Sequence, residues 1–572
     1  MTDNTYDINL ISEETGQDIA NALKGTFAAF DLGVIENADG TNTTSLWRKY
    51  LYQMLAAGHT DRYEILTEFM RALAAAWGDK TYTLRGYDAS LASGLTALTP
   101  MDDLAGKTAA QLCTDATAPV ADWADEDPMT WYIRANALSL ADGSMNILAF
   151  EGEADFDLSG EIAPVYTFQK ALYLKEWNDG TYDYISYRTT RMAGYYPDAG
   201  DVAPDNSMRV LTWHPSFEGG LNSSGKLTSG AGVAPYLFAS ANDGITKARL
   251  WDDDGNGGHY EGLWSDCDTR WALRMWQLRH FDKENSNILE GCTNYNLQYT
   301  VALAESNVKR VLVTTSQGSG FVVGSSVCVG DPGENTNYDR GYAYMRNLAG
   351  PAVRISSIEN VTIEGTTYTA LNLEVDAPFT TTAGTKVSTM PWFSGSTEAL
   401  PEHKDGSIGS LTNGKFPMRV SGVEFLGGAY TIGLDPLYNV VAGSDADHFT
   451  YQIYECRNSE KLAGSITSDY INTGIVVEDI MKGWNYVKRF ITTKLGVLFP
   501  DLFGGSSTTF YKSAFRGADS AGVRCPWRFA HLDNGGHAGL AYENGNCSPG
   551  YSDWHSRPRL GGSGKKRGEW AA

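Results

Sequence analysis

The segment Ala521–Leu560 near the C-terminus concentrates residue types that could do chemistry. It holds three of the nine histidines of the chain and, among them, an aspartate and a cysteine: His531, Asp533, His537, Cys547 and His555. Imidazole, carboxylate and thiolate groups are all zinc ligands. Their spacing matches no common zinc pattern, because only one cysteine stands among the histidines. Two interpretations therefore stand, a metal site or surface side chains that bind an external ligand, and the second is favoured.

The same segment mixes two classes of position. The first class is small or turn-forming and predicts a stiff backbone, because glycine and proline permit tight turns and close approach. We call these the frame positions: Gly535, Gly536, Ala538, Gly539, Leu540, Gly545, Ser548, Pro549, Gly550, Trp554, Pro558 and Leu560. The second class follows no hydrophobic period and so does not predict one face of a helix or strand. We call these the variable positions: Phe529, His531, Asp533, His537, Cys547, Tyr551, Asp553, His555 and Ser556.

The variable positions also share a property of the genetic code. Phe, His, Asp, Cys, Tyr and Ser are all encoded by codons that end in a pyrimidine. Each arises from an asparagine codon when the two adenines are replaced freely. Lys, Gln, Glu, Met and Trp do not arise in this way, and none of them occupies a variable position. Trp527, Glu543 and Trp554 are therefore assigned to the stiff part of the segment.

The run NGGHAGLAYENGNCSPGYSDWHSRPRL resembles the C-terminal variable region of proteins diversified by diversity-generating retroelements. It looks like the asparagine-rich template of that family with many asparagines substituted. The resemblance covers about forty residues, and extending the fold upstream to about residue 406 is an extrapolation. It implies a C-type lectin fold that displays a hypervariable ligand-binding face, here the variable positions. Phage tail receptor-binding proteins of the tropism-determinant type and bacterial surface proteins are the best-known members of that family.

Composition limits the classes of function. A chain of 572 residues predicts several domains, and 42% hydrophobic residues are ample for buried cores. The 31 tyrosines and 15 tryptophans suit binding surfaces and β-rich modules. A net charge of −24 argues against nucleic-acid binding, which needs a basic face. The short basic run Lys565-Lys566-Arg567 is expected to be a solvated terminus.

Cysteine usage and the N-terminal sequence indicate the compartment in which the protein is assembled. The seven cysteines are scattered without CxxC spacing, which argues against a disulfide framework and fits assembly in a reducing host cytoplasm. The start MTDNTYDINL lacks the basic and apolar pattern of a signal peptide. No run of about 18 apolar residues occurs, so no membrane insertion is expected. An adhesin without an export signal fits a phage, because lysis releases its virions.

The chain is expected to be α+β and multidomain. The expected parts are a helical N-terminal domain (1–125), an α+β domain (126–305), a small β barrel or sandwich (306–405) and a C-type lectin-like ligand-binding domain (406–572), with the variable region at about 521–560. Helical periodicity predicts one helix capped by Ser12 and two more, from about Thr44 to Gly58 and from Thr60 to Gly78.

The residue pattern after the N-terminal region predicts individual strands, helices and turns. Short alternating runs predict strands at Tyr166–Tyr173, Tyr182–Arg188, Met418–Phe425 and His448–Tyr454. Glu364-Gly365 predicts a hairpin turn. Helices are expected at Trp271–Phe281 and at Val476–Thr493. Asp252–Gly257 matches the first half of a calcium loop, but its twelfth position would be Leu263 rather than glutamate, so a calcium site and a plain acidic turn both remain open.

The leading hypothesis is a phage tail receptor-binding protein without enzymatic activity or cofactor. It would bind a bacterial surface receptor, protein or glycan, contact other tail proteins of the virion and associate with itself, as a homotrimer. The alternatives are a structural virion component of the tail tip or head, or a bacterial surface display protein. An enzyme of the formylglycine-generating fold would need a paired-cysteine copper site, and of Cys525 and Cys547 the second is itself a variable position.

The codon argument makes a direct prediction about the gene. All nine variable positions should have codons ending in C or T, matched by AAC or AAT in an asparagine-rich template repeat near a reverse-transcriptase gene. Sequencing the locus checks this. A locus without a template, or a template identical to the gene at these positions, would remove the claim of diversification.

Overall fold

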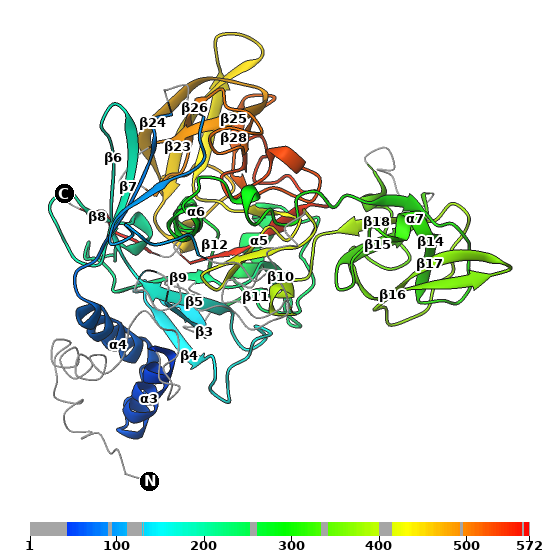
Figure 1. Cartoon of the computed structure of the whole chain (residues 1–572), viewed down its shortest axis with the longest axis horizontal. Coiled ribbons are helices and arrows are strands. Elements are labelled where there is room, and N and C mark those ends of the chain that lie inside the picture. Colours follow the sequence, from blue (N-terminus) through cyan, green and yellow to red (C-terminus); the bar gives the residue numbers. More distant parts are fainter. Residues whose placement is uncertain are drawn as a thin grey trace.

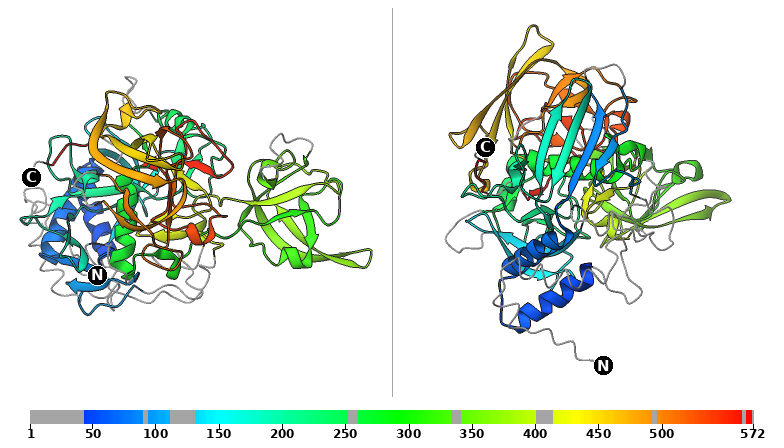
Figure 2. Two further views of the ribbon diagram at one scale, coloured as in Figure 1. Left: turned by 90° about the horizontal axis from the view of Figure 1, so that it is seen from above. Right: turned by 60° about the vertical axis from the view of Figure 1, so that its left-hand side comes forward.

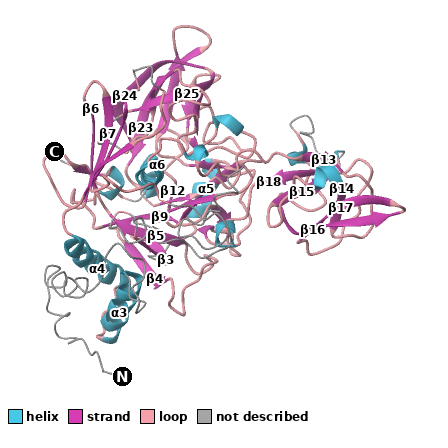
Figure 3. Ribbon diagram, viewed as in Figure 1, coloured by secondary structure: helices cyan, strands magenta, loops and turns pink. Residues whose placement is uncertain are grey.

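The computed structural model describes residues 43–89, 94–110, 129, 131–251, 260–332, 341–399, 414–491, 496–562 and 566–570. The helix expected after Ser12 and the acidic run Asp252–Gly257 lie outside these residues. The described part is mostly β-sheet, with five α-helices and several separate sheets (Figures 1 and 3). The observed architecture is therefore richer in β-structure than an evenly mixed α+β chain.

Two helices cover one face of a four-stranded sheet near the N-terminal end. The helices are α3 (Thr43–Ala56) and α4 (Arg62–Trp77), and the sheet has the order β4-β3-β5-β9, with bounds Met145–Phe150, Tyr132–Ser139, Val165–Lys170 and Leu211–Pro215. Asp61 caps α4 by accepting the Glu64 N–H, and Gly78 ends it with φ 78°. Trp47 packs edge-on against Phe69 of α4 and Phe150 of β4. Both predicted helices are confirmed, and they share their core with a sheet.

A five-stranded antiparallel sheet packs on the central helix. Its order is β2-β1-β7-β6-β8, with bounds Thr99–Asp102, Thr81–Tyr87, Tyr182–Arg188, Tyr173–Asn178 and Tyr196–Pro197. Its inner side chains, including Leu84 and Leu174, join one hydrophobic core with helix α6 (Asp266–His280). Ser265 and Asp268 form a capping box at the start of α6, and every residue of α6 is buried. The expected helix at Trp271–Phe281 is confirmed in a longer form.

A six-stranded module projects from the rest of the molecule (Figures 1 and 2). Its order is β13-β18-β15-β16-β17-β14, with bounds Gln298–Thr300, Lys386–Met390, Ser326–Gly330, Val353–Ile363, Thr366–Leu373 and Arg310–Thr314, and it carries the one-turn helix α7 (Thr315–Gly318). A bridge between Leu303 and Leu312 joins the two ends of the sheet, which closes it into a small barrel. The expected hairpin turn lies at Glu364 (φ 49°) and Gly365 (φ 81°).

The C-terminal part contains two larger sheets. One has the order β24-β23-β22-β28, with bounds Tyr470–Met481, His448–Cys456, Leu437–Ala442 and Gly522–Arg524. The other has the order β26-β25-β27-β30-β29-β21-β31, with bounds Pro500–Phe503, Gly483–Phe490, Ala514–Gly517, Glu543–Asn544, Trp527–Arg528, Tyr430–Ile432 and Ser556–Pro558. The hairpin β19 (Met418–Val420) and β20 (Val423–Phe425) precedes them and matches the predicted strand region.

The helix expected at Val476–Thr493 is wrong. This region forms the second half of β24 and then β25, and Gly483 (φ 81°) begins the second strand. Ile480, Trp484 and Val487 fall at helical spacing, but the β-branched run at 475–477 favours a strand. Pairing with β23 and β27 supplies the backbone hydrogen bonds, so tertiary pairing prevails over the local period.

Segments on both sides of the barrel build one common body. Strand β12 (Gly262–Leu263) pairs with β32 (Leu560–Gly561), and the short helix α5 (Ala241–Ala248) shares a core with Leu560 and Trp527. The hairpin β10 (Gly219–Leu221) and β11 (Leu227–Ser229) packs beside them. The core thus crosses the boundary expected at about residue 406, and the barrel is an insertion into a larger unit.

Buried arginines tie the C-terminal segment to this body. Arg528 forms ion pairs with Asp266 and, at 2.7 Å, with Glu543. Arg557 donates to Glu218 at 2.5 Å, and all of these side chains are almost fully buried. Because charges lose their hydration on burial, each arginine requires its partner.

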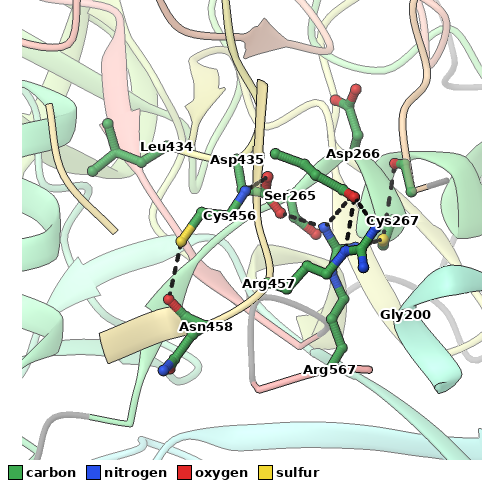
Figure 4. A network of polar contacts seen from close by, with 12 residues as sticks. Gly200, Ser265, Asp266, Cys267, Leu434, Asp435, Cys456, Arg457, Asn458 and Arg567 are labelled. Atoms are coloured by element: carbon green, nitrogen blue, oxygen red, sulfur yellow. Dashed lines mark hydrogen bonds and ion pairs between the residues drawn. The ribbon is translucent and has the colours of Figure 1, made fainter. Parts of the chain in front are cut away.

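The expectation that the basic run Lys565-Lys566-Arg567 is a solvated terminus is wrong for Arg567. Arg567 is 7% exposed and forms an ion pair with Asp435 at 3.0 Å (Figure 4). It forms a second ion pair with Glu455 at 3.1 Å. It also donates to the Cys267 thiol. The basic run therefore ends in a buried arginine, because two buried carboxylates neutralise the charge of Arg567.

Loss of one such arginine should destabilise the whole body. Arg557→Met leaves the Glu218 carboxylate buried without its cation, and we expect the free energy of unfolding to fall by ~3–5 kcal/mol. Arg489→Met is the matched control, because its ion pair with Asp501 at 2.9 Å is partly exposed and should contribute under ~1 kcal/mol. Urea titrations of the two variants measure both values. Equal urea midpoints for the two variants would contradict the stabilising role assigned to Arg557.

Candidate functional site: a pocket in the C-terminal segment

The frame positions of the C-terminal segment hold a tight backbone. Trp554 is buried. Gly539 has φ 138°, and a Cβ atom there would lie 2.4 Å from Ser513 Oγ and 3.0 Å from Asn285 Oδ1. Asn285 also accepts the Leu540 N–H at 2.7 Å. Glycine is therefore required at this position, both for its backbone angle and for close approach, as the sequence predicts.

Four of the variable positions line one surface pocket of about 550 Å³, which we call the C-terminal pocket. They are Cys547, Tyr551, Asp553 and His555. The remaining lining residues are mostly polar: Arg516, Asp519, Ser520, Arg524, Trp527, Asn544, Asn546 and Ser548. A volume of this size suits a small ligand or one anchoring side chain or sugar of a larger one.

Asp553 is the centre of the polar contacts in the pocket. Its carboxylate accepts hydrogen bonds from the Tyr551 hydroxyl at 2.7 Å, from the Trp554 N–H at 2.8 Å and from the Tyr344 hydroxyl. Burial alone would raise the pKa of this carboxyl, but the His555 imidazole and these hydrogen bonds outweigh burial and hold the pKa below its ordinary value. Asp553 is therefore a fixed negative charge. Tyr344 belongs to the barrel, so the barrel contacts the pocket directly.

An aromatic cluster forms the floor behind this carboxylate. His555 stacks on Trp554 with ring centroids 4.7 Å apart and meets His531 edge-on at 4.3 Å. Desolvation by the surrounding rings, together with the neighbouring His555, lowers the pKa of His531 well below its ordinary value. The His531 Nδ1 accepts the Asp533 N–H at 3.1 Å. His531 is therefore neutral and supports His555 from beneath.

Two other variable positions lie outside the pocket. His537 stacks on Trp484 of β25 at 4.6 Å and on Tyr486 at 5.4 Å. Trp484 in turn lies 6.0 Å from the Arg516 guanidinium, which lines the pocket. Asp533 is exposed on the same loop. His537 thus continues the aromatic surface away from the pocket rim.

The expected surface position of Phe529 and Ser556 is wrong. Phe529 is buried against Phe425 at 5.2 Å and Trp264 at 5.7 Å. Ser556 is fully buried in β31, where its hydroxyl donates to the Ala239 carbonyl and accepts the Asp553 N–H at 2.9 Å. The codon argument identifies which residues could be encoded at a position, but it carries no information on the direction of a side chain.

Cys547 lines the pocket but is also largely buried. Burial raises the pKa of its thiol to about 12, so it stays protonated at neutral pH. A protonated thiol is a poor nucleophile and a poor metal ligand. Cys547 therefore contributes shape to the pocket wall. The six described cysteines are all buried and unpaired by disulfides.

Sequence reasoning missed the basic wall of the pocket. Arg516 precedes the segment Ala521–Leu560 and forms an ion pair with Asp519 at 2.9 Å. Arg524 lies within the segment and donates to the Ser520 carbonyl and hydroxyl. The lysines and arginines of this glycine-rich stretch follow no period that would have predicted a basic wall. Only the fold brings these cations beside Tyr551.

Comparisons with other proteins add no assignment. No family model matches the chain. No curated protein matches it either.

In the described ranges, no group of three or more His, Cys, Asp or Glu side chains is arranged to hold a metal ion. None of the described helices is long and apolar enough to cross a membrane. The arrangement of the C-terminal pocket is suited to reversible binding through aromatic rings, guanidinium groups, amides and one carboxylate.

The geometry separates the variable positions into two groups with different responses to substitution. Phe529→Ala removes a buried aromatic and should lower the free energy of unfolding by ~3–5 kcal/mol. Tyr551→Ala changes a side chain that is 40% exposed and should cost about 1 kcal/mol or less. Denaturant melts of the two variants test the division. A larger loss for Tyr551→Ala than for Phe529→Ala would refute it.

Proposed function

We propose that this protein is a phage tail receptor-binding protein that displays a diversified C-terminal pocket to a receptor on the bacterial surface. The observation that carries the proposal is the convergence of Cys547, Tyr551, Asp553 and His555 on one pocket above a buried frame. These residues come from the segment that resembles a retroelement-diversified region. The proposed activity is binding, without a catalytic step or a cofactor.

The chemistry of the pocket supports a recognition role. Tyr551 presents an exposed ring, while Arg516 and Asn546 add donors that are held by neighbouring acceptors. Rigid aromatic and guanidinium groups dominate binding energy at protein interfaces. Buried support beneath them keeps the geometry constant when the exposed side chains change. Substitution at the rim would thus alter specificity while the backbone stays in place.

The proposed fold of this region is C-type lectin-like. We propose that this unit reaches beyond residues 406–572, because β12 pairs with β32 and α5 packs against the same core. The barrel would then be an insertion within the lectin-like unit.

Assembly and location follow from the same resemblance. We propose a homotrimer located in the phage tail of the virion, in contact with other tail proteins and assembled in the host cytoplasm. Closed symmetry is the common solution for such assemblies. Several weak pockets on one particle also multiply affinity. Light scattering measures the proposed trimer directly, and a monomer at micromolar concentration would contradict it.

A cell-binding experiment tests the role of the pocket. Fluorescently labelled wild-type protein is applied to a panel of bacterial strains, and a strain that it binds is used for the variants. Tyr551→Ala should weaken binding by ~2 kcal/mol, or about thirtyfold, if this ring anchors the receptor.

Tyr52→Ala is the matched control, because Tyr52 is 54% exposed on α3, which covers a different sheet. It should leave cell binding unchanged, and both variants should keep the melting temperature of the wild type to within a few degrees. Equal binding by Tyr551→Ala and the wild type would place the receptor contact elsewhere on the molecule.

A further inference from the structure

We propose that Tyr344 of the inserted barrel is a positioning residue of the C-terminal pocket, because its hydroxyl holds the Asp553 carboxylate in place. The proposal rests on the receptor-binding function proposed above and deepens it. Among the described residues, Tyr344 is not one of those that line the pocket, so it would act on a receptor through Asp553. It also lies far upstream of the segment Ala521–Leu560, so a constant residue of the barrel would contribute to the specificity of a diversified site.

Tyr344 is fixed to the barrel by the turn that it ends. This 3₁₀ turn, η6 (Tyr342–Tyr344), packs against β13 and β18, the first and last strands of the barrel. The Tyr342 N–H donates to the Gln298 side chain of β13 at 3.0 Å, and the Met345 N–H donates to the Tyr342 carbonyl at 2.9 Å. The position of the Tyr344 hydroxyl therefore follows the position of the barrel.

The Tyr344 ring is buried where the barrel meets the body. It shares a hydrophobic cluster with Met390 of the barrel and with Leu532 and Trp554 of the body. Phe238 meets it edge-on, with ring centroids 5.7 Å apart. A ring that is held by packing on several sides presents its hydroxyl in one direction, and here that direction is toward the pocket carboxylate.

Donors on both carboxylate oxygens fix the orientation of Asp553. Oδ1 accepts the Tyr344 hydroxyl and, at 2.8 Å, the Trp554 N–H, while Oδ2 accepts the Tyr551 hydroxyl at 2.7 Å. Burial raises the pKa of this carboxyl, but the His555 imidazole and these hydrogen bonds lower it by more. Because hydrogen bonds to an ionised acceptor are strong, the Tyr344 hydroxyl supports both the direction and the charge of the carboxylate.

The backbone of Asp553 is held from the same side. Its carbonyl accepts the Phe238 N–H at 3.0 Å and the Ser556 N–H at 3.1 Å. Phe238 has φ 55°, which is uncommon for a bulky residue and marks a constrained position. Arg346 of the barrel lies over the Phe238 ring at 3.6 Å. The barrel thus contacts Asp553 directly through Tyr344 and indirectly through Phe238.

Hydrogen–deuterium exchange of the full-length protein without a ligand tests whether the hydroxyl holds Asp553. Three amides report on this residue, because the N–H groups of Phe238, Trp554 and Ser556 all donate to it. Tyr344→Phe keeps the buried ring and removes the hydroxyl. These amides should then exchange about tenfold faster, the factor expected for loss of one charge-assisted hydrogen bond.

A control variant and a double-mutant cycle make the result specific. Tyr299→Phe removes the hydroxyl of another barrel tyrosine, which packs on Phe321 with centroids 6.0 Å apart, and should leave the exchange unchanged. In an Asp553→Asn background, Tyr344→Phe should accelerate exchange only about threefold, because a hydrogen bond to a neutral acceptor is about half as strong. A role in packing alone would give the same acceleration in both backgrounds.

Cell binding measures the consequence for recognition. On a bacterial strain that the wild type binds, Tyr344→Phe should weaken binding about tenfold, while its melting temperature stays within a few degrees of the wild type. Tyr299→Phe should bind like the wild type. If Tyr551→Ala binds like the wild type, the proposed function fails, and the exchange result on Tyr344 stands by itself. If no strain of the panel is bound, the exchange measurements decide alone.

Each of three results would overturn the proposal. Unchanged exchange in Tyr344→Phe would show that the hydroxyl does not hold Asp553. An equal effect of Tyr344→Phe in the wild-type and Asp553→Asn backgrounds would show that the ring acts through packing. Wild-type cell binding by Tyr344→Phe, with binding weakened in Tyr551→Ala, would show that the position of the carboxylate plays no part in recognition.

Discussion

The fold depends on arginines that the part of the chain from Arg528 onward buries in the interior. Arg528, Arg557 and Arg567 meet carboxylates that come from three separate stretches of the chain, Asp266, Glu218 and Asp435. A guanidinium group cannot shed its proton at any ordinary pH, so each must be neutralised where it lies. A buried ion pair adds little net stability over an apolar pair, but a partner left alone is very costly. The C-terminal segment is thereby held in one register against the body.

This constraint is compatible with the proposed exchange of side chains on a stiff backbone. Two residues that line the C-terminal pocket, Asp553 and His555, lie just before the buried Arg557 in the sequence. The backbone is therefore fixed from below by charge and by the Trp554 ring. The exposed Tyr551 ring does not take part in that anchoring, whereas the Asp553 carboxylate does, because it accepts the Trp554 N–H. Phe529 and Ser556 show the limit, because they point into the core and cannot vary without loss of packing.

Much of the local structure was predictable from the sequence, and much of the tertiary structure was not. Helix α4, with Asp61 at its start and Gly78 at its end, and the turn at Glu364-Gly365 follow from local rules. The region 476–493 does not, because its spacing fits a helix while its pairing partners make it two strands. Four of the twelve residues that line the pocket came from the codon pattern of Ala521–Leu560. Arg516 and the barrel residue Tyr344 could not be found in this way, since they reach the site only through long-range packing.

The insertion of the barrel has a consequence for the history of the molecule. Its first and last strands, β13 and β18, pair directly, with Gln298 opposite Ser388, so the chain enters and leaves the barrel at neighbouring points. A module attached in this way can be gained or deleted as a cassette while the two cut ends of the host stay within reach of a short linker. The Tyr344 hydroxyl donates a hydrogen bond to Asp553, so the barrel contributes to the C-terminal pocket and is more than a spacer. A lineage that lost the barrel would keep the rest of the fold, but the Asp553 carboxylate in the C-terminal pocket would lose one of its hydrogen-bond donors.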